Sequence, residues 1–201
     1  MLQKRPQSSQ EEFIDTSYFI YCLEAVDDVE IETEVITEVQ KDLAQLTMQF
    51  GIASIYKTCD TIEGLEASLM ALVSEDHNFK DYEIIYFMIA GEANNICIND
   101  YYYSLQEIAE LFEGRLQGKI LHFSNAKTLD LDEEEAQYFL DITGAKAVSG
   151  YGNPFNGITS SQLDKAFFNL FKEDENMLDV VEELHQKYYT ACKLLDFRMY
   201  Y

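Results

Sequence analysis

Two apolar stretches decide the fold of this chain: Tyr82-Glu83-Ile84-Ile85-Tyr86-Phe87-Met88-Ile89, which runs into Ala90-Gly91-Glu92, and Lys119-Ile120-Leu121-His122-Phe123, which ends on Ser124. Both are nearly continuous apolar runs of strand length, as expected of parallel strands that are covered on both faces. Between them lies the capping-box pattern Ser104-Leu105-Gln106-Glu107, followed by apolar residues at helical spacing. This order of strand, helix and strand predicts a parallel sheet.

The same alternation extends over the rest of the chain. Apolar runs predict three further strands, at residues 18–23, 53–57 and 145–149. Residues 96–98 and 101–103 predict a hairpin around the turn pair Asn99-Asp100. Apolar residues at spacings of three and four predict helices over residues 31–50, 60–73, 104–114, 130–144, 160–171 and 177–195. We therefore expect an α/β fold, a three-layer sandwich in which a mainly parallel sheet has helices on both faces.

Length and composition indicate one domain. The chain has 201 residues, 47% of them apolar, including 13 Phe and 14 Tyr, which is ample for a sizeable core. Residues 1–12 are polar and are predicted to form a flexible leader, and residues 13–201 form the expected domain. The leader carries no hydrophobic signal region, and the longest apolar run, residues 84–90, is too short for a bilayer, so we expect neither export nor membrane insertion.

The chain is strongly acidic, with 37 Asp and Glu against 14 Lys and Arg and a net charge of -23. Such a charge repels DNA, RNA and anionic membranes, so we expect a protein partner, no nucleic acid and no membrane. Most of the acids are expected on solvated helix faces. The cysteines have no C-x-x-C spacing and indicate reduced structural thiols of a cytoplasmic protein: Cys22, Cys59, Cys97 and Cys192.

Motifs that bind common cofactors are missing from the sequence. It contains neither G-x-G-x-x-G nor G-x-x-x-x-G-K-[ST], and its three histidines lack zinc-ligand spacing. We expect no cofactor and no metal. Gly150-Tyr151-Gly152 is predicted to be a loop at the carboxyl edge of the sheet, where open α/β sheets bind ligands, which makes Tyr151 a candidate pocket wall.

His122 lies two residues before Ser124, so the two side chains share one face of the predicted strand. An imidazole beside a hydroxyl can activate it as a nucleophile. Side chains two residues apart in a strand do not have the geometry of a catalytic dyad, however. We therefore favour a hydrogen-bonded core histidine.

From residue 18 to residue 171, the order of strands and helices resembles the caspase-like fold shared by caspases and the bacterial CHAT peptidases. In caspases the third strand ends in Ser-His-Gly before a hairpin, and the fourth ends in a Gln-Ala-Cys motif. The corresponding ends here are Ile89-Ala90-Gly91-Glu92 and Ile120-Leu121-His122-Phe123-Ser124-Asn125. A further resemblance, to the fifth strand and next helix of CHAT peptidases, lies in Thr143-Gly144-Ala145-Lys146-Ala147-Val148-Ser149-Gly150-Tyr151 and Leu163-Asp164-Lys165-Ala166-Phe167-Phe168.

The resemblance implies the fold and the place of the pocket, but not the chemistry. Ala90 stands in place of the general base and Ser124 in place of the nucleophile, at a shorter interval than in caspases. A serine hydroxyl needs a base within hydrogen-bond reach, and Ala90 cannot supply one. We expect no proteolysis by the caspase mechanism. The resemblance leaves a candidate pocket formed by Gly91, Glu92, His122, Asn125 and Tyr151.

Three functions follow from these patterns. The first is a non-catalytic caspase-like domain that acts as an interaction or regulatory module. The second is a hydrolase with a rearranged site, in which Ser124 or Cys97 is the nucleophile and His122 or Glu92 assists. The third is a flavodoxin-like sensor that binds Mg²⁺ through carboxylates at the strand ends: Glu24, Asp28 and Glu92.

Overall fold

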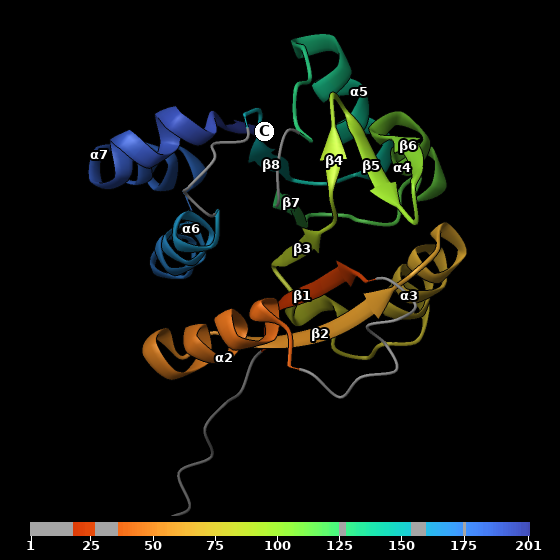
Figure 1. Cartoon of the computed structure of the whole chain (residues 1–201), viewed down its shortest axis with the longest axis horizontal. Coiled ribbons are helices and arrows are strands. Elements are labelled where there is room, and N and C mark those ends of the chain that lie inside the picture. Colours follow the sequence, from red (N-terminus) through yellow and green to blue (C-terminus); the bar gives the residue numbers. More distant parts are fainter. Residues whose placement is uncertain (1–17, 27–35, 125–127, 154–159, 175) are drawn as a thin grey trace, which may run out of the picture.

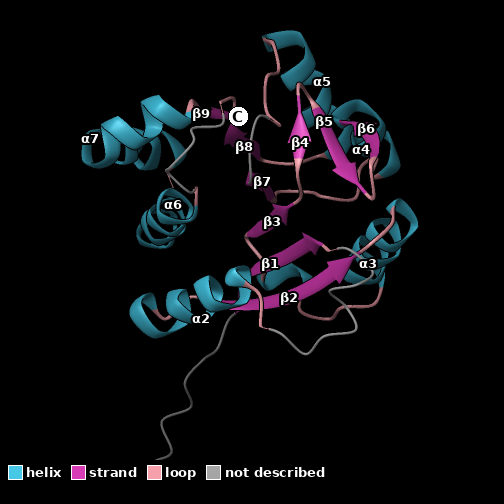
Figure 2. Ribbon diagram, in the orientation of Figure 1, coloured by secondary structure: helices cyan, strands magenta, loops and turns pink. Residues whose placement is uncertain are grey.

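The computed structural model describes residues 18–26, 36–124, 128–153, 160–174 and 176–201. Its centre is a sheet of six strands in the order β2-β1-β3-β7-β8-β9 (Figure 1; β9 is labelled in Figure 2). Five of the strands are parallel, and the last is antiparallel to its neighbour. The strands are β1 (Tyr18–Ala25), β2 (Ala53–Cys59), β3 (Ile84–Met88), β7 (Ile120–Ser124), β8 (Ala147–Tyr151) and the antiparallel β9 (Phe197–Tyr200).

Helices cover both faces of this sheet (Figures 1 and 2). One layer contains α2 (Glu38–Phe50), α6 (Ser161–Glu173) and α7 (Met177–Leu195). The other contains α3 (Ile62–Ser74), α4 (Leu105–Leu111) and α5 (Glu133–Thr143). A short 3₁₀ helix, η1 (Phe79–Asp81), precedes β3. The predicted three-layer α/β sandwich with a mainly parallel sheet is confirmed.

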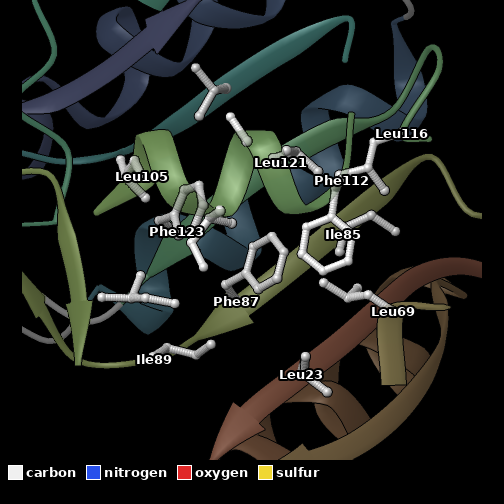
Figure 3. Packing of buried hydrophobic residues seen from close by; sticks show 14 of the residues in the cluster. Leu23, Leu69, Ile85, Phe87, Ile89, Leu105, Phe112, Leu116, Leu121 and Phe123 are labelled. Carbon is white, nitrogen blue, oxygen red and sulfur yellow. The ribbon is translucent and has the colours of Figure 1, made fainter. Parts of the chain in front are cut away.

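Successive residues of the central strands enter two separate cores. In β3 and β7, Phe87 and Phe123 stack at 4.8 Å between ring centroids in the core beneath α3, α4 and α5 (Figure 3). Tyr86, next to Phe87 in β3, and Ile120 of β7 enter the core beneath α2, α6 and α7. Because both faces are covered, these strands are apolar at nearly every position, which explains the continuous runs in the sequence.

The helices begin at capping residues that are visible in the sequence. Ser104 forms a capping box at the start of α4, as predicted, and Asp132 forms one at the start of α5, two residues after the predicted start at Asp130. The helix predicted over residues 31–50 begins later than expected, at Glu38, because Thr37 adopts an extended conformation and accepts a hydrogen bond from the amide of Gln40. Ile36 precedes this cap and is exposed, and residues 31–35 lie outside the described residues.

The predicted hairpin is part of a small separate sheet that follows β3. Its strands are β4 (Gly91–Glu92), β5 (Asn95–Ile98) and β6 (Tyr101–Ser104), paired antiparallel. The turn residues Asn99 and Asp100 have φ values of 51° and 65°, the positive values that a two-residue type I′ turn requires. The hairpin is confirmed, and its sheet connects the end of β3 to the start of α4.

Two expectations near the end of the chain are wrong. Gly150 and Tyr151 belong to β8 and not to a loop, and they pair with Phe123 on one side and Phe197 on the other. A Cβ at Gly150 would lie 2.6 Å from the carbonyl oxygen of Phe123, so only glycine fits there. The sequence predicts no strand after the last helix, yet residues 197–200 form β9 at the edge of the sheet.

The predicted leader, residues 1–12, lies outside the described residues, as do residues 13–17 of the predicted domain. Among the helices that the structure describes, none combines the length and the apolar character needed to cross a membrane.

Candidate functional site

The carboxyl ends of β3, β7 and β8 lie at one edge of the sheet. Met88, the last residue of β3, pairs with Ser124, the last residue of β7. Ala90 lies just beyond β3, is exposed, and accepts a hydrogen bond from the amide of Cys97 at 2.7 Å through its carbonyl oxygen. The structure thus brings the ends of the two strands together, as predicted, with a methyl group at one of them and a hydroxyl at the other.

A buried carboxylate, Asp164 of α6, faces this edge from the helical layer. It is only 1% exposed. Its Oδ2 accepts hydrogen bonds from the hydroxyls of Tyr86 at 2.8 Å and Ser124 at 2.6 Å. Its Oδ1 accepts from the hydroxyl of Tyr151 and bonds Nε2 of His122 at 2.8 Å. Each carboxylate oxygen therefore has two partners, which matches its two lone pairs.

Two serines bond to the residues around Asp164. Ser149 Oγ lies 2.8 Å from Nδ1 of His122, and Ser160 Oγ lies 2.7 Å from Ser124 Oγ. When Nε2 of a neutral imidazole donates to Asp164, Nδ1 accepts from the Ser149 hydroxyl. We call these residues the Asp164 cluster: Tyr86, His122, Ser124, Ser149, Tyr151, Ser160 and Asp164.

Aromatic rings enclose the cluster. The His122 ring lies 5.3 Å from that of Phe167, 5.4 Å from that of Phe168 and 6.4 Å from that of Phe197, between centroids. Burial, followed by the charge of Asp164, raises the pKa values of the Tyr86 and Tyr151 hydroxyls well above 10. Both phenols therefore remain protonated donors at neutral pH. No buried side-chain polar atom in the described part of the chain lacks a hydrogen-bond partner.

The geometry of the cluster is not that of a nucleophile with its base. In a serine triad the histidine stands between the hydroxyl and the carboxylate, so that it can take the serine proton. Here Ser124 and His122 each bind Asp164, and the second nitrogen of His122 is occupied by Ser149. Ser124 is also fully buried. The cluster joins α6 to three strands, and all of its members except the half-buried Ser160 are buried.

Of the predicted pocket residues, His122 and Tyr151 lie in the Asp164 cluster, and the prediction of a hydrogen-bonded core histidine is confirmed. Gly91 and Glu92 form β4, away from these contacts, with Glu92 exposed. A Cβ at Gly91 would collide with the carbonyl oxygen of Asn95 and the hydroxyl of Thr128, which explains glycine there. Asn125 lies outside the described residues.

Ser124 and His122 of the hydrolase hypothesis belong to the Asp164 cluster, whereas Cys97 and the carboxylate Glu24 of the sensor hypothesis lie elsewhere. Cys97 of β5 is half-buried and pairs with Tyr102 across the hairpin. Glu24 accepts hydrogen bonds from the hydroxyls of Tyr56 at 2.5 Å and Thr37 at 3.0 Å. Asp28 lies outside the described residues. In the parts of the chain that the structure places, no group of three His, Cys, Asp or Glu side chains is arranged to hold a metal ion.

The remaining three cysteines are buried and unpaired: Cys22, Cys59 and Cys192. Burial raises the pKa of Cys59 to about 12 and that of Cys192 to about 11, and it raises the pKa of Cys22 well above 9. Such thiols are protonated at neutral pH and therefore poor nucleophiles. This agrees with the prediction of structural thiols.

Sequence reasoning missed the centre of the cluster, Asp164, its partner Tyr86, and the two outer serines, Ser149 and Ser160. A signal was present for Asp164. It lies three, four and seven residues before Phe167, Phe168 and Phe171, so an acid occupies the apolar stripe of α6. A buried acid requires buried donors, and alternate positions of β7 and β8 supply them.

The fold and the site define an α/β protein with an antiparallel edge strand and a buried, fully hydrogen-bonded carboxylate beneath the carboxyl edge of its sheet. Residues 17–201 match the family of unknown function DUF6642, so the chain belongs to that family. No curated protein sequence matches the chain significantly.

Proposed function

We propose that this protein is a non-catalytic caspase-like domain that acts as an interaction or regulatory module. The arrangement around β3 supports the resemblance: β3 is followed by a hairpin sheet, then by α4, and then by β7, which pairs with β3. The two strand ends that would carry a histidine and a cysteine in a caspase carry Ala90 and Ser124.

The observation that carries the proposal is the state of Ser124. Its hydroxyl is fully buried and donates to Asp164 at 2.6 Å, and its Oγ lies 2.7 Å from Ser160 Oγ. A nucleophile must reach its substrate and must have a base for its proton. The contacts of Ser124 instead hold α6 against the sheet, which is a structural role.

The net charge supports a protein partner, and the cysteines support a cytoplasmic location. A net charge of -23 disfavours nucleic acid and anionic membranes, so the partner is a protein. Three buried cysteines without disulfides, among the residues that the structure places, support a cytoplasmic location.

Chemical labelling tests the absence of an activated nucleophile. The folded protein is treated with a fluorophosphonate and, separately, with a peptidyl electrophile, and its intact mass is compared with that of heat-unfolded protein and of the Ser124→Ala and Cys97→Ala variants. An active serine hydrolase and an active cysteine peptidase serve as positive controls. We expect no stoichiometric adduct that requires the folded state. An adduct formed only by folded protein and lost in one variant would contradict the proposal and support the rearranged hydrolase.

The stability of the same Ser124→Ala variant gives an independent test. The substitution removes one of the four donors to a buried carboxylate, so we expect the free energy of unfolding to fall by about 1–3 kcal/mol in urea titrations. Catalytic residues are commonly replaced with no loss, or with a gain, of stability, because active sites sacrifice stability for function. Unchanged or increased stability would therefore count against a structural role of Ser124.

A further inference from the structure

A cavity of about 330 Å³ opens between the first turns of α4 and α5, beside the small sheet. It lies in the helical layer opposite to α6 and is therefore separate from the Asp164 cluster (Figure 1). Its apolar lining comes from Leu105, Leu131 and Phe139, which are 1%, 8% and 1% exposed. These buried side chains provide a surface for an alkyl chain.

The polar part of the lining is negatively charged. Glu134 and Glu135 of α5 contribute carboxylates, and none of the residues that line the cavity is a lysine or an arginine. Glu135 is held in place, because its Oε2 accepts from the amide of Asp132 at 2.9 Å and from Nδ2 of Asn94 at 3.4 Å. Glu134 is exposed to solvent.

An aromatic ring completes the lining. Tyr138 is 39% exposed, and its hydroxyl donates to Oε1 of Glu110 at 3.0 Å. The same oxygen accepts from Nε2 of Gln106 at 2.9 Å, so α4 and α5 both hold the phenol. A ring held in this way presents a face to which a cation is attracted.

We propose that this cavity binds an arginine side chain from a basic segment of a partner protein. The alkyl stem packs on Leu105, Leu131 and Phe139, and the guanidinium meets the carboxylates of Glu134 and Glu135 and the ring of Tyr138. A guanidinium combines bidentate bonding to carboxylates with stacking on aromatic rings, which a lysine ammonium does not. The proposal rests on the interaction role proposed above and names the class of partner.

The two carboxylates of the lining disfavour both anionic and wholly apolar ligands. An anionic ligand would meet two carboxylates in a protein of net charge -23. A wholly apolar ligand would bury carboxylate oxygen without a donor, which is costly. A cationic group with an apolar stem satisfies both parts of the lining.

Amide NMR of the full-length protein, titrated with a short peptide, tests this assignment. The probe is an acetylated and amidated Gly-Ala-Arg-Ala-Gly peptide, compared with the same peptide carrying lysine and with one carrying glutamine in place of arginine. We expect the arginine peptide to shift the amides of Gln106, Glu135 and Tyr138, with weaker binding of the lysine peptide and none of the glutamine peptide. Arginine and glutamine peptides that bind alike, or shifts that lie elsewhere, would overturn the proposal.

Matched variants separate this site from the general charge of the protein. Glu134→Gln should raise the dissociation constant about threefold to tenfold, whereas Glu182→Gln, an equal change of charge at an exposed position of α7, should leave it unchanged. An equal loss in both variants would show that only the overall field acts. Tyr138→Leu should weaken the arginine peptide more than the lysine peptide, because it removes the ring on which the guanidinium stacks.

The mass of the recovered peptide distinguishes this proposal from the proposed function. An intact peptide that does not bind rejects the arginine site and leaves the non-catalytic role in place. A peptide cleaved by the folded protein rejects the non-catalytic role, whether or not the cavity binds it.

Discussion

Asp164 comes from α6 and binds side chains of three neighbouring strands, β3, β7 and β8. A charge buried to this extent is tolerated only when donors replace the lost water. All four of its acceptor positions are used, so the removal of any partner leaves an unsatisfied group. The packing of α6 against the sheet therefore depends on each single residue that bonds to Asp164.

The substitution Asp164→Asn tests this dependence. An amide has nearly the same shape, but its nitrogen donates where two donors already point, so we expect the free energy of unfolding to fall by about 3–5 kcal/mol. Urea unfolding followed by circular dichroism measures the change. Asp141→Asn, at an exposed position of α5, is the control and should change stability by no more than about 0.5 kcal/mol.

If Asp164→Asn does not fold, Ser149→Ala keeps the test open. It removes only the partner of Nδ1 of His122, and we expect a loss of about 1–2 kcal/mol. Full stability in either variant would show that the cluster does not hold α6 in place.

At the scale of elements, β9 is the edge strand of the sheet, and its Phe197 packs against the Asp164 cluster. Phe197 is 6% exposed, and its ring lies 5.9 Å from that of Tyr151 and 5.6 Å from that of Phe167, between centroids. Arg198 forms ion pairs with Asp196 at 2.6 Å and with Asp130. The strand thus joins α7, β8 and the segment that follows β7.

Phe197→Ala tests the contribution of β9. Loss of a buried aromatic ring should lower the free energy of unfolding by about 3–4 kcal/mol, because the ring leaves a cavity between α6, α7 and β8. Tyr201→Ala, which removes an aromatic ring four residues later that is 57% exposed, should have little effect. Equal effects of the two substitutions in urea unfolding would mean that β9 is not part of the core.

At the scale of the whole molecule, burial of phenols and thiols links stability to alkaline pH. Burial raises the pKa of Tyr21 from 10.0 to about 12, that of Cys59 from 9.0 to about 12 and that of Cys192 from 9.0 to about 11. Groups with a raised folded-state pKa hold their protons longer in the folded state than in the unfolded state. Their contribution to stability is complete below pH 9 and is lost as pH rises through the folded-state values.

We therefore expect the urea midpoint to be similar at pH 7 and pH 8 and to fall steadily between pH 9 and pH 11. The lowered pKa of buried Lys119 acts in the opposite direction, but it is one group against several. Repeating the series at high salt separates this effect from the repulsion of a chain with a net charge of -23. A midpoint that does not change up to pH 11 would contradict the expectation.

The sequence predicted most elements because their signals are local. The strand runs, the capping box at Ser104 and the Asn99-Asp100 turn each lie within a few residues. The late start of α2 could also be found locally, since Thr37 and Gln40 form a capping box. The strand β9 has only four residues and no strong apolar alternation, so its sequence does not predict a strand.

By itself, the sequence determined the α/β class, the hairpin after β3 and the two strand ends that carry Ala90 and Ser124, because periodicity, caps and strand order follow from neighbouring residues. Only the tertiary structure decided the Asp164 cluster, β9 and the cavity between α4 and α5. Each of these depends on which distant segments pack together. Asp164 lies 78 residues from Tyr86 in the chain, and nothing local to either one indicates that they bond.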